Sequence, residues 1–522
     1  MPLPTKVAAG SGEAAINIGV NVPNNFSFLI YNIGLAVSPT LLGIALFLPR
    51  LWDAVIDPVM GSVSDNAKTR WGRRRPFMLV GGLLSIVGMF VICYVPGGIK
   101  ETDWGQREWG PQLPLGFVTL DLYQPLGDWF YCAYLTLVCI LFYTALTIFA
   151  VPYGALTMEL TSNYSERTRV MSFRTLFTYL SGLLMAWIYP LARQSQDPVQ
   201  GALVVGVVLA VVILVVTMVP TLFVREPKRV IAAPPTPGSD RPGPEKIGLV
   251  RGIKETLAVP AFLMILAAYT VGFLGVIMVI KLGKYVNFYH VYGGGEEGLD
   301  KGAFVQGWAE TLATLCGIAA AFMINRLARR VEKKWILIGA LSCSFVGGLL
   351  SWMLYSPGFS TWEKSLPLFG QFGEGTWAGW LPNQITFAFH PLILSFALIW
   401  PGLAGLLIMS NSMIADLCDV DELKTGQRRE GMYWAVFNWI QKTAIGIALL
   451  FSGVILDIVG YDADAEIQSD SAIFNMRLAY LLVVCGGVAV AALITAFIPI
   501  TQKRMEAVRA ELEARRTTSP GA

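Results

Sequence analysis

Residues 50–61 read RLWDAVIDPVMG, and they place two aspartates, Asp53 and Asp57, inside an otherwise apolar helical run. Asp57 lies roughly 12 Å before Asp65, which belongs to the next polar segment, so it is well inside the hydrocarbon region. A charge at the centre of a membrane helix costs at least about 2.5–3.5 kcal/mol. The stretch therefore predicts a membrane helix that keeps its charges for a functional reason.

The composition is that of a protein that crosses the membrane many times. Of the 522 residues, 54% are hydrophobic and 14% are charged, and the mean hydropathy is +0.57. A spanning helix needs about 20 mostly apolar residues, and such runs recur along the whole chain. We expect an all-α membrane protein with twelve transmembrane helices, at residues 14–35, 39–62, 77–98, 128–155, 171–192, 201–224, 257–289, 304–325, 335–356, 388–415, 432–457 and 474–499.

The segment REPKRVIAAPPTPGSDRPGPEKIGLVRGIKE, from Arg225 to Glu255, is rich in Pro, Gly and charge, which is typical of a flexible linker. Six apolar runs precede it and six follow it. Two such halves indicate parallel repeats related by an axis along the membrane normal. The predicted organisation is an N-terminal half at 1–224, a cytoplasmic linker at 225–255, a C-terminal half at 256–500 and a cytoplasmic tail at 501–522.

The basic side chains are distributed unevenly between the predicted loops. With both termini in the cytoplasm, most of the 39 Lys and Arg fall on the cytoplasmic side, as the positive-inside rule requires. Residues 1–15 lack a basic region followed by a short apolar core, so we expect no cleaved signal. We therefore expect a multi-pass protein of the plasma membrane, the inner membrane in a bacterium. The opposite loops hold Lys100, Arg107, Arg193, Lys301 and Lys364.

No motif of the sequence indicates catalysis. The seven cysteines are scattered without paired or CxxC spacing, which supports neither a disulfide framework nor a zinc site. His290 and His390 fall near predicted helix ends, where an interfacial position is favoured over a metal or catalytic role. No GxSxG, Walker A or dinucleotide-binding motif occurs in its required context. We expect no enzyme, no cofactor, no metal beyond a coupling Na⁺ and no nucleic-acid partner.

The spacing of Asp53 and Asp57 puts both carboxylates on one helix face, with Arg50 on nearly the same stripe. Two neighbouring carboxylates repel unless a positive group lies between them or one binds a proton. A bound Na⁺ or H⁺ would satisfy this condition. The alternative is an ion network of Arg50 with both aspartates that only locks the helix.

Further charges lie inside the predicted spans: Arg174, Lys281, Lys284, Glu310, Lys442 and Arg477. Lys442 is too deep in its span to reach the interface easily, so we expect this cation of the second half to face the aspartates of the first. Lys281, Lys284 and Arg477 lie closer to the interface, where snorkelling is the favoured interpretation. The role of Glu310 stays open.

The stretch RLWDAVIDPVMGSVSDNAKTRWGRRRPF (50–77) resembles the signature of the glycoside–pentoside–hexuronide:cation symporters, the melibiose permease family of the major facilitator superfamily. The likeness extends to AVPYGALTMELTSNYSERTRVMSFR (150–174) and to ADLCDVDELKTGQRREGMYWAVFNWIQK (415–442). The resemblance implies the major facilitator fold. It also implies that Asp53, Asp57 and Thr147 bind the coupling cation, and that Arg174 and Lys442 lie at the sugar site.

The sugar site departs from the family pattern. Ala150 stands where the melibiose permease has an aspartate that grips galactosyl hydroxyls, and Gly154 replaces the aromatic residue that stacks on the sugar. A galactoside is therefore disfavoured. Asn438, one turn before Lys442, is a further candidate for solute contact, or else an interhelical hydrogen bond. Other candidate contacts are Asn17, Asn21, Asn24 and Asn25.

The resulting expectation is a monomeric secondary active symporter, in which Na⁺ or H⁺ drives uptake of a sugar or glycoside by alternating access. The first alternative keeps the cation site but carries a lysolipid or other amphiphile, as distant family members do. The second is a membrane sensor that does not transport. Polar turns on the cytoplasmic face are expected to form the gate from Asp65, Arg70, Arg73, Arg74, Arg75, Asp419, Asp421, Glu422 and Arg428.

Overall fold

The computed structural model describes residues 2–67, 69, 71–114, 119–160, 164–193, 198–224, 249–328, 330–367, 384–425 and 430–518. Within these ranges the chain is almost entirely helical. Most of the predicted linker, and two of the predicted gating residues, Arg70 and Arg428, lie outside the described residues.

The first half consists of long helices that begin mostly at proline or after a short loop. Pro39 and Pro76 lie in the first turns of α2 and α3, where a missing amide proton costs no helical hydrogen bond. The elements are α1 (Leu3–Ser27), the π-helix η1 (Phe28–Gly34), α2 (Pro39–Asn66), α3 (Arg75–Cys93), α4 (Leu126–Glu159), α5 (Tyr164–Ala186), α6 (Ile188–Ala192) and α7 (Pro198–Phe223).

The second half repeats this pattern, including a π-helical turn at the end of its first long helix. Its elements are α8 (Leu249–Leu257), α9 (Pro260–Tyr285), the π-helix η2 (Val286–Val291), α10 (Gly295–Leu327), α11 (Lys333–Leu354), α12 (Leu392–Thr425), α13 (Glu430–Ile458), α14 (Asp470–Ala496) and α15 (Gln502–Thr518). The matching π-helical turns, η1 and η2, are consistent with two related halves.

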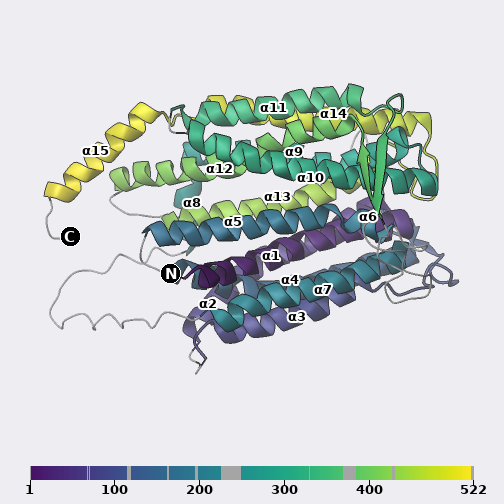
Figure 1. Cartoon of the computed structure of the whole chain (residues 1–522), viewed down its shortest axis with the longest axis horizontal. Coiled ribbons are helices and arrows are strands. Elements are labelled where there is room, and N and C mark those ends of the chain that lie inside the picture. The colour runs from purple at the N-terminus through teal and green to yellow at the C-terminus, as the bar shows by residue number, and fades with distance from the viewer. Residues whose placement is uncertain are drawn as a thin grey trace.

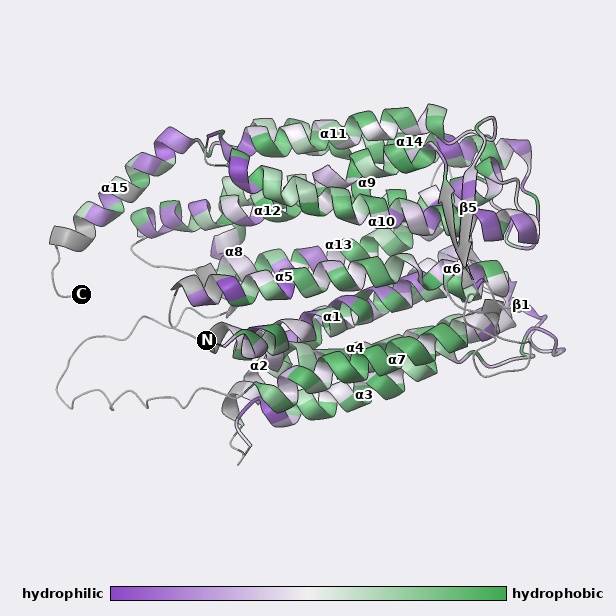
Figure 2. Ribbon diagram, viewed as in Figure 1, coloured by the Kyte–Doolittle hydropathy of each residue, from purple (hydrophilic) through white to green (hydrophobic). Residues whose placement is uncertain are grey.

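Among the described residues, eleven helices are long and apolar enough to span a membrane. The ribbons of these helices are mostly coloured as hydrophobic, whereas much of α15 is coloured as hydrophilic (Figure 2). The helix formed by α1 and η1 is not among these eleven; it is more polar, and its Asn17 hydrogen-bonds Ser181 on α5. The expected all-α membrane fold is confirmed.

The expected first span, 14–35, was too short, because α1 begins at Leu3. Residues 3–13 are small or polar, so a hydropathy pattern does not include them, yet many are buried against neighbouring helices. Lys6 forms an ion pair of 2.8 Å with Glu166 on α5, and a Cβ at Gly10 would come within 2.9 Å of the backbone of Phe173.

The helices lie side by side in two groups, α1–α7 and α9–α14, and both termini lie at one end of the bundle (Figure 1). We call this end the terminal side and the opposite end the loop side. Within the first group α1 packs on α5 and α7, and α2 and α3 pack on α4. Within the second, α9 packs on α14, and α11 packs on α12 and α14. Between the groups, α2 packs on α13 and α5 on α10.

The loop side carries short antiparallel strand pairs in the segments between α3 and α4 and between α11 and α12. Pairs form between β1 (Glu108–Trp109) and β4 (Gln124–Pro125), between β2 (Gln112–Pro114) and β3 (Thr119–Asp121), and between β5 (Trp362–Pro367) and β6 (Gln384–Phe389). In the last pair Trp362 lies opposite Phe389. The cross-strand pairing, which joins residues far apart in sequence, has no local signature.

Glycines allow α2 and α13 to approach closely near the loop side. A Cβ at Gly43 would lie 3.0 Å from the carbonyl oxygens of Leu449 and Leu450, and one at Gly453 would overlap the carbonyl oxygen of Pro39. These contacts hold the two halves together on the loop side. They also make the closure of this side sensitive to a single methyl group.

Replacing Gly453 by Ala is expected to separate α2 from α13 and to disfavour the loop-side closure by on the order of 1–3 kcal/mol, the usual cost of overpacking. In a cysteine-free background, a cysteine at Asn438 should then react several-fold more slowly with a hydrophilic thiol reagent from the terminal side. Gly339→Ala is the matched control, because a Cβ there meets nothing within 4 Å. Equal labelling rates in the two variants would contradict the expectation.

Candidate functional site

Asp53 and Asp57 lie one turn apart on α2, and both face Thr147 on α4. The Thr147 hydroxyl oxygen is 3.0 Å from Asp53 Oδ1 and 3.1 Å from Asp57 Oδ1. Thr147 and Asp53 are buried, whereas the Asp57 side chain is 32% exposed. A hydroxyl has one proton, so it can satisfy only one of the two carboxylates fully. The remaining oxygens form a compact group of hard acceptors.

Lys442 of α13 brings a positive charge from the second half to this group. Its Nζ lies 3.0 Å from Asp53 Oδ2 and also contacts Asp57 Oδ2. The side chain is 31% exposed, so the ammonium and Asp57 are within reach of solvent. Chemically, the ammonium occupies the place that a monovalent cation would take between two carboxylates.

Arg50 does not form the expected alternative network with the two aspartates. Its guanidinium donates to the carbonyl oxygen of Val20 at 2.6 Å and lies 4.3 Å from the ring centroid of Tyr143. Arg50 is 1% exposed, and within the described part of the chain no ion pair joins it to Asp53 or Asp57. The aspartates therefore have a lysine partner from the other half instead of a permanent partner on their own helix.

Arg174, predicted from the resemblance to bind solute, pairs inside the first half. Its Nη2 is 2.6 Å from Glu13 Oε2, its Nη1 donates to the Thr157 hydroxyl at 3.0 Å, and its guanidinium lies 5.3 Å from the Tyr153 ring. Glu13 was not among the predicted site residues, although an acidic residue directly before an expected span could have indicated a partner for Arg174. Most donors of Arg174 are thus occupied, and its contact with solute stays a prediction.

The space beside these residues is open. A Cβ at Gly154 would meet nothing within 4 Å, and Asn438 is exposed one turn from Lys442. The α1 asparagines are partly used within the first half, since Asn17 donates to the Ser181 hydroxyl at 2.8 Å and Asn21 to Asn17. A larger side chain would therefore have room at Gly154 on α4.

The snorkelling expected of Lys281 and Lys284 is wrong. Lys281 Nζ donates to the carbonyl oxygen of Asn24 at 3.2 Å and lies 5.2 Å from the Phe28 ring, both in the first half. Lys284 forms an ion pair of 3.2 Å with Glu310 on α10. Both lysines point between helices because partners are available there. Arg477 likewise donates inward, to the Trp352 carbonyl oxygen at 2.8 Å.

The two halves meet through polar and aromatic contacts on the loop side. Arg193 pairs with Asp300 at 2.7 Å, and the Tyr285 hydroxyl donates to Asn32 Oδ1 at 2.6 Å. The rings of Tyr189 and Phe288 stack at 5.1 Å between centroids. These contacts indicate that the bundle is closed on the loop side.

The predicted gating residues lie at the terminal side where they are described. Arg75 donates to the carbonyl oxygens of Thr221 and Leu222 at the end of α7, and Arg74 and Asp421 are buried. Of this set, Arg73, Asp419 and Glu422 are also described, whereas the Asp65 side chain lies outside the described part of the structure. Their gating role stays a prediction.

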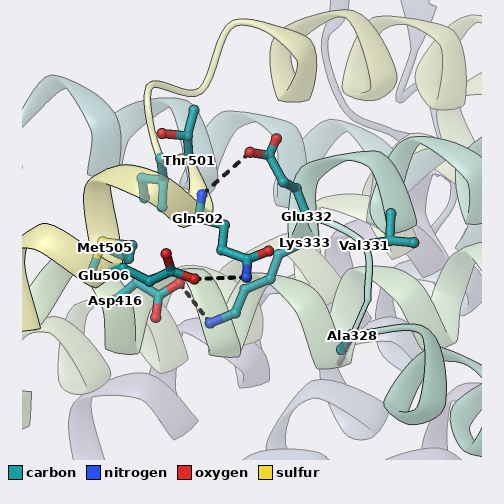
Figure 3. A pocket seen from close by; sticks show the side chains of 10 residues that line it. Ala328, Val331, Glu332, Lys333, Asp416, Thr501, Gln502, Met505 and Glu506 are labelled. Carbon is teal, nitrogen blue, oxygen red and sulfur yellow. Dashed lines mark hydrogen bonds and ion pairs between the residues drawn. The ribbon is translucent and has the colours of Figure 1, made fainter.

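A separate cavity of about 170 Å³ lies where α15 meets the turn between α10 and α11 (Figure 3). Lys333 pairs there with Asp416 at 2.6 Å, and Gln502 donates to Glu506 at 2.9 Å. Met505 is buried in this contact. Because its polar groups satisfy one another, the cavity serves to dock α15 and lies apart from the carboxylate pair.

A protein family described as MFS/sugar transport protein matches residues 8–502. The chain is 25% identical to an uncharacterized symporter of Synechocystis sp., with 98% of this chain and 96% of the relative aligned. It is 24% identical to a glucuronide carrier protein homolog of Escherichia coli, with 95% of this chain and 94% of the relative aligned.

A partial match joins the chain to the mouse sodium-dependent lysophosphatidylcholine symporter 1, with 34% identity over 28% of this chain and 24% of that protein. Among solved structures, a bacterial homolog of the human lysosomal transporter Spinster gives a TM-score of 0.59 at 12% identity, over 98% of this chain and 96% of that chain. At this identity the likeness shows the fold alone. The chain is thus an integral multi-pass membrane protein, and it belongs to the MFS/sugar transport family and, within the major facilitator superfamily, to the glycoside–pentoside–hexuronide:cation symporters.

Proposed function

We propose that this protein is a cation-coupled symporter, in which Na⁺ or H⁺ binds at Asp53, Asp57 and Thr147. The observation that carries the proposal is the position of the Lys442 ammonium between the two carboxylates, 3.0 Å from Asp53 Oδ2. Carboxylate and hydroxyl oxygens are ligands suited to a hard cation. A cation or proton that enters this group competes with Lys442 for the same negative charge.

Competition of this kind couples the cation to the two halves, because Lys442 belongs to α13 and the aspartates belong to α2. When the cation binds, the ammonium is released from Asp57 and can hydrogen-bond the solute. When the cation leaves, Lys442 restores the ion pairs. The two halves then rock about this site in alternating access.

The proposed orientation places the terminal side in the cytoplasm of a cell with the protein in its plasma membrane, the inner membrane of a bacterium. The conformation described here is then open to the inside. Loop-pair contacts among Asp65, Arg73 and Asp419 and their neighbours would close that side in the other state, at about 0–1 kcal/mol for each exposed pair. The protein acts as a monomer and needs no cofactor besides the coupling ion.

The proposed solute is a sugar or glycoside, which the match to a sugar-transport family and to a glucuronide carrier homolog supports. A lysolipid is the second candidate. The partial likeness to a lysophosphatidylcholine symporter and the open space at Gly154 support it. A sensor that does not transport is disfavoured, because it predicts an Arg50 partner for the aspartates.

A counterflow screen in proteoliposomes tests the proposal. Proteoliposomes that contain the purified protein are loaded with glycosides or with lysolipids in separate preparations. Exchange is measured with Na⁺ present or replaced by choline, and at two external pH values. We expect exchange with one solute class that strengthens with Na⁺ or with acidification. The proposal would be contradicted if no glycoside and no lysolipid exchanged, or if exchange depended on neither Na⁺ nor pH.

A further inference from the structure

A small cavity lies between the first and second halves, on the loop-side flank of the cation site. Its polar lining consists of Asn24 and Asn25 of α1, Tyr189 of α6, and Lys281 and Lys284 of α9. The volume is about 20 Å³, which is room for about one water molecule. The stacked rings of Tyr189 and Phe288 and the bond between Tyr285 and Asn32 belong to the same region, so closure of the loop side keeps the cavity narrow.

Two lysines, Lys281 and Lys284, line this cavity, whose wall is otherwise mainly apolar. Lys284 is balanced by Glu310, which also accepts from Gln306 at 3.1 Å. Lys281 has no such balance: in the part of the chain that the structure describes, its ammonium contacts the Asn24 carbonyl oxygen and the Phe28 ring, and no carboxylate. An ammonium between helices with only a carbonyl and a ring for partners is expensive, so an anionic occupant would stabilise it.

Two further polar groups of the lining lack a hydrogen-bond partner within the described ranges. They are Asn24 Oδ1 and the Tyr189 hydroxyl, and their residues are 7% and 6% exposed. Buried polar groups are normally satisfied. The Tyr189 hydroxyl can donate and therefore lacks an acceptor, whereas Asn24 Oδ1 only accepts and needs a donor such as a solute hydroxyl. A hydroxyl donor and an unbalanced ammonium from two residues that line one cavity can together bind an oxyanion.

We propose that Lys281, with the Tyr189 hydroxyl as second donor, binds an oxyanion of the transported solute, either a sugar carboxylate or a lysolipid phosphate. This inference rests on the proposed transport function and names its substrate class. The loss of a carboxylate at Ala150 and the presence of Lys281 act together, since both turn a site for neutral hydroxyls into one for a negatively charged group.

The Asn24 carbonyl oxygen that binds Lys281 lies about one helical turn from Val20, whose carbonyl oxygen binds Arg50, and Arg50 lies nearly one turn from Asp53. Together these two steps place the oxyanion subsite on the order of 10 Å from the aspartates along the bundle axis. A solute of that length contacts Lys281 with its anionic group and reaches the vicinity of Lys442 with its other end. Opening of the loop side widens the subsite for binding. Its closure narrows the subsite and favours release toward the terminal side.

The test is equilibrium binding to purified protein in detergent, without any ion gradient. Two matched pairs separate the two sources of the oxyanion: phenyl β-glucuronide against phenyl β-glucoside, and lysophosphatidylcholine against the monoacylglycerol with the same acyl chain. We expect the wild type to prefer the charged member of one pair by about tenfold or more. Lys281→Gln should remove this preference, Lys281→Arg should retain most of it, and Tyr189→Phe should weaken it several-fold.

Lys301→Gln is the matched control, because Lys301 is 50% exposed and pairs with the exposed Glu297; its preference should equal that of the wild type. Equal affinity for both members of both pairs overturns the inference, as does a preference that survives Lys281→Gln. Because no gradient is involved, failure of ion coupling leaves this preference intact. Failure of the subsite, in turn, leaves cation-driven uptake in place.

Discussion

Replacing Asp57 by Asn is expected to abolish cation-driven accumulation of solute. The amide keeps the shape of the carboxylate but loses the charge that attracts Na⁺ or H⁺ and that pairs with Lys442. Without a bound cation there is no coupling free energy, so the ratio of internal to external solute should fall to about 1. The measurement is uptake into proteoliposomes against an imposed Na⁺ or H⁺ gradient.

The thermal stability of the Asp57→Asn protein should change little, because Asp57 is about one-third exposed. Counterflow should persist but should no longer strengthen with Na⁺ or with acidification. Glu297→Gln provides the matched control, since it makes the same chemical change at a side chain that is 84% exposed. Undiminished uphill uptake by Asp57→Asn would refute the coupling role of this carboxylate.

Replacing Lys442 by Gln is expected to raise the affinity of the site for the cation, whereas Asp57→Asn is expected to lower it. The ammonium competes for the carboxylates, so its removal leaves Asp53 and Asp57 facing each other without a balancing charge. Cation affinity should rise by about 10–100-fold, whereas net uptake should fall because the empty carrier can no longer neutralise its site. Equilibrium binding of ²²Na⁺ and the pH dependence of solute binding measure this change.

Lys333→Gln is a suitable comparison, because Lys333 also pairs with a buried aspartate, Asp416, but does so within one half and far from the carboxylate pair. Its cation affinity should equal that of the wild type. An unchanged or weaker cation affinity in Lys442→Gln would show that the ammonium is no competitor of the ion.

The cluster of Asp53, Asp57 and Lys442 could be anticipated from the sequence because charge inside a membrane span is costly. Asp53 and Asp57 stand out in an apolar run, and the depth of Lys442 indicated a partner in the other half. The fold follows from repeated apolar runs around one polar linker. The predicted roles of Thr147 and Arg174 came from the resemblance to a family, because the sequence around a hydroxyl or an arginine in a helix does not indicate which residue it contacts.

The missed features depend on contacts between distant segments. Hydropathy cannot include residues 3–13 in α1, because small and polar residues there are buried by α5 and α7 rather than by lipid. Lys281 and Lys284 lie near a predicted helix end, so their positions in the sequence favoured side chains that extend toward the membrane interface. Only the packing of α9 against α1 and α10 brings the Asn24 carbonyl oxygen and Glu310 within reach.

The most direct test of the central claim is to record ion movement caused by solute alone. Solute is added to lightly buffered proteoliposomes without a gradient, and external pH and Na⁺ are followed with electrodes. We predict that wild-type protein carries Na⁺ or H⁺ inward together with solute, and that Asp57→Asn carries solute without either ion. Entry of solute into wild-type vesicles with no movement of Na⁺ or H⁺ would contradict the account.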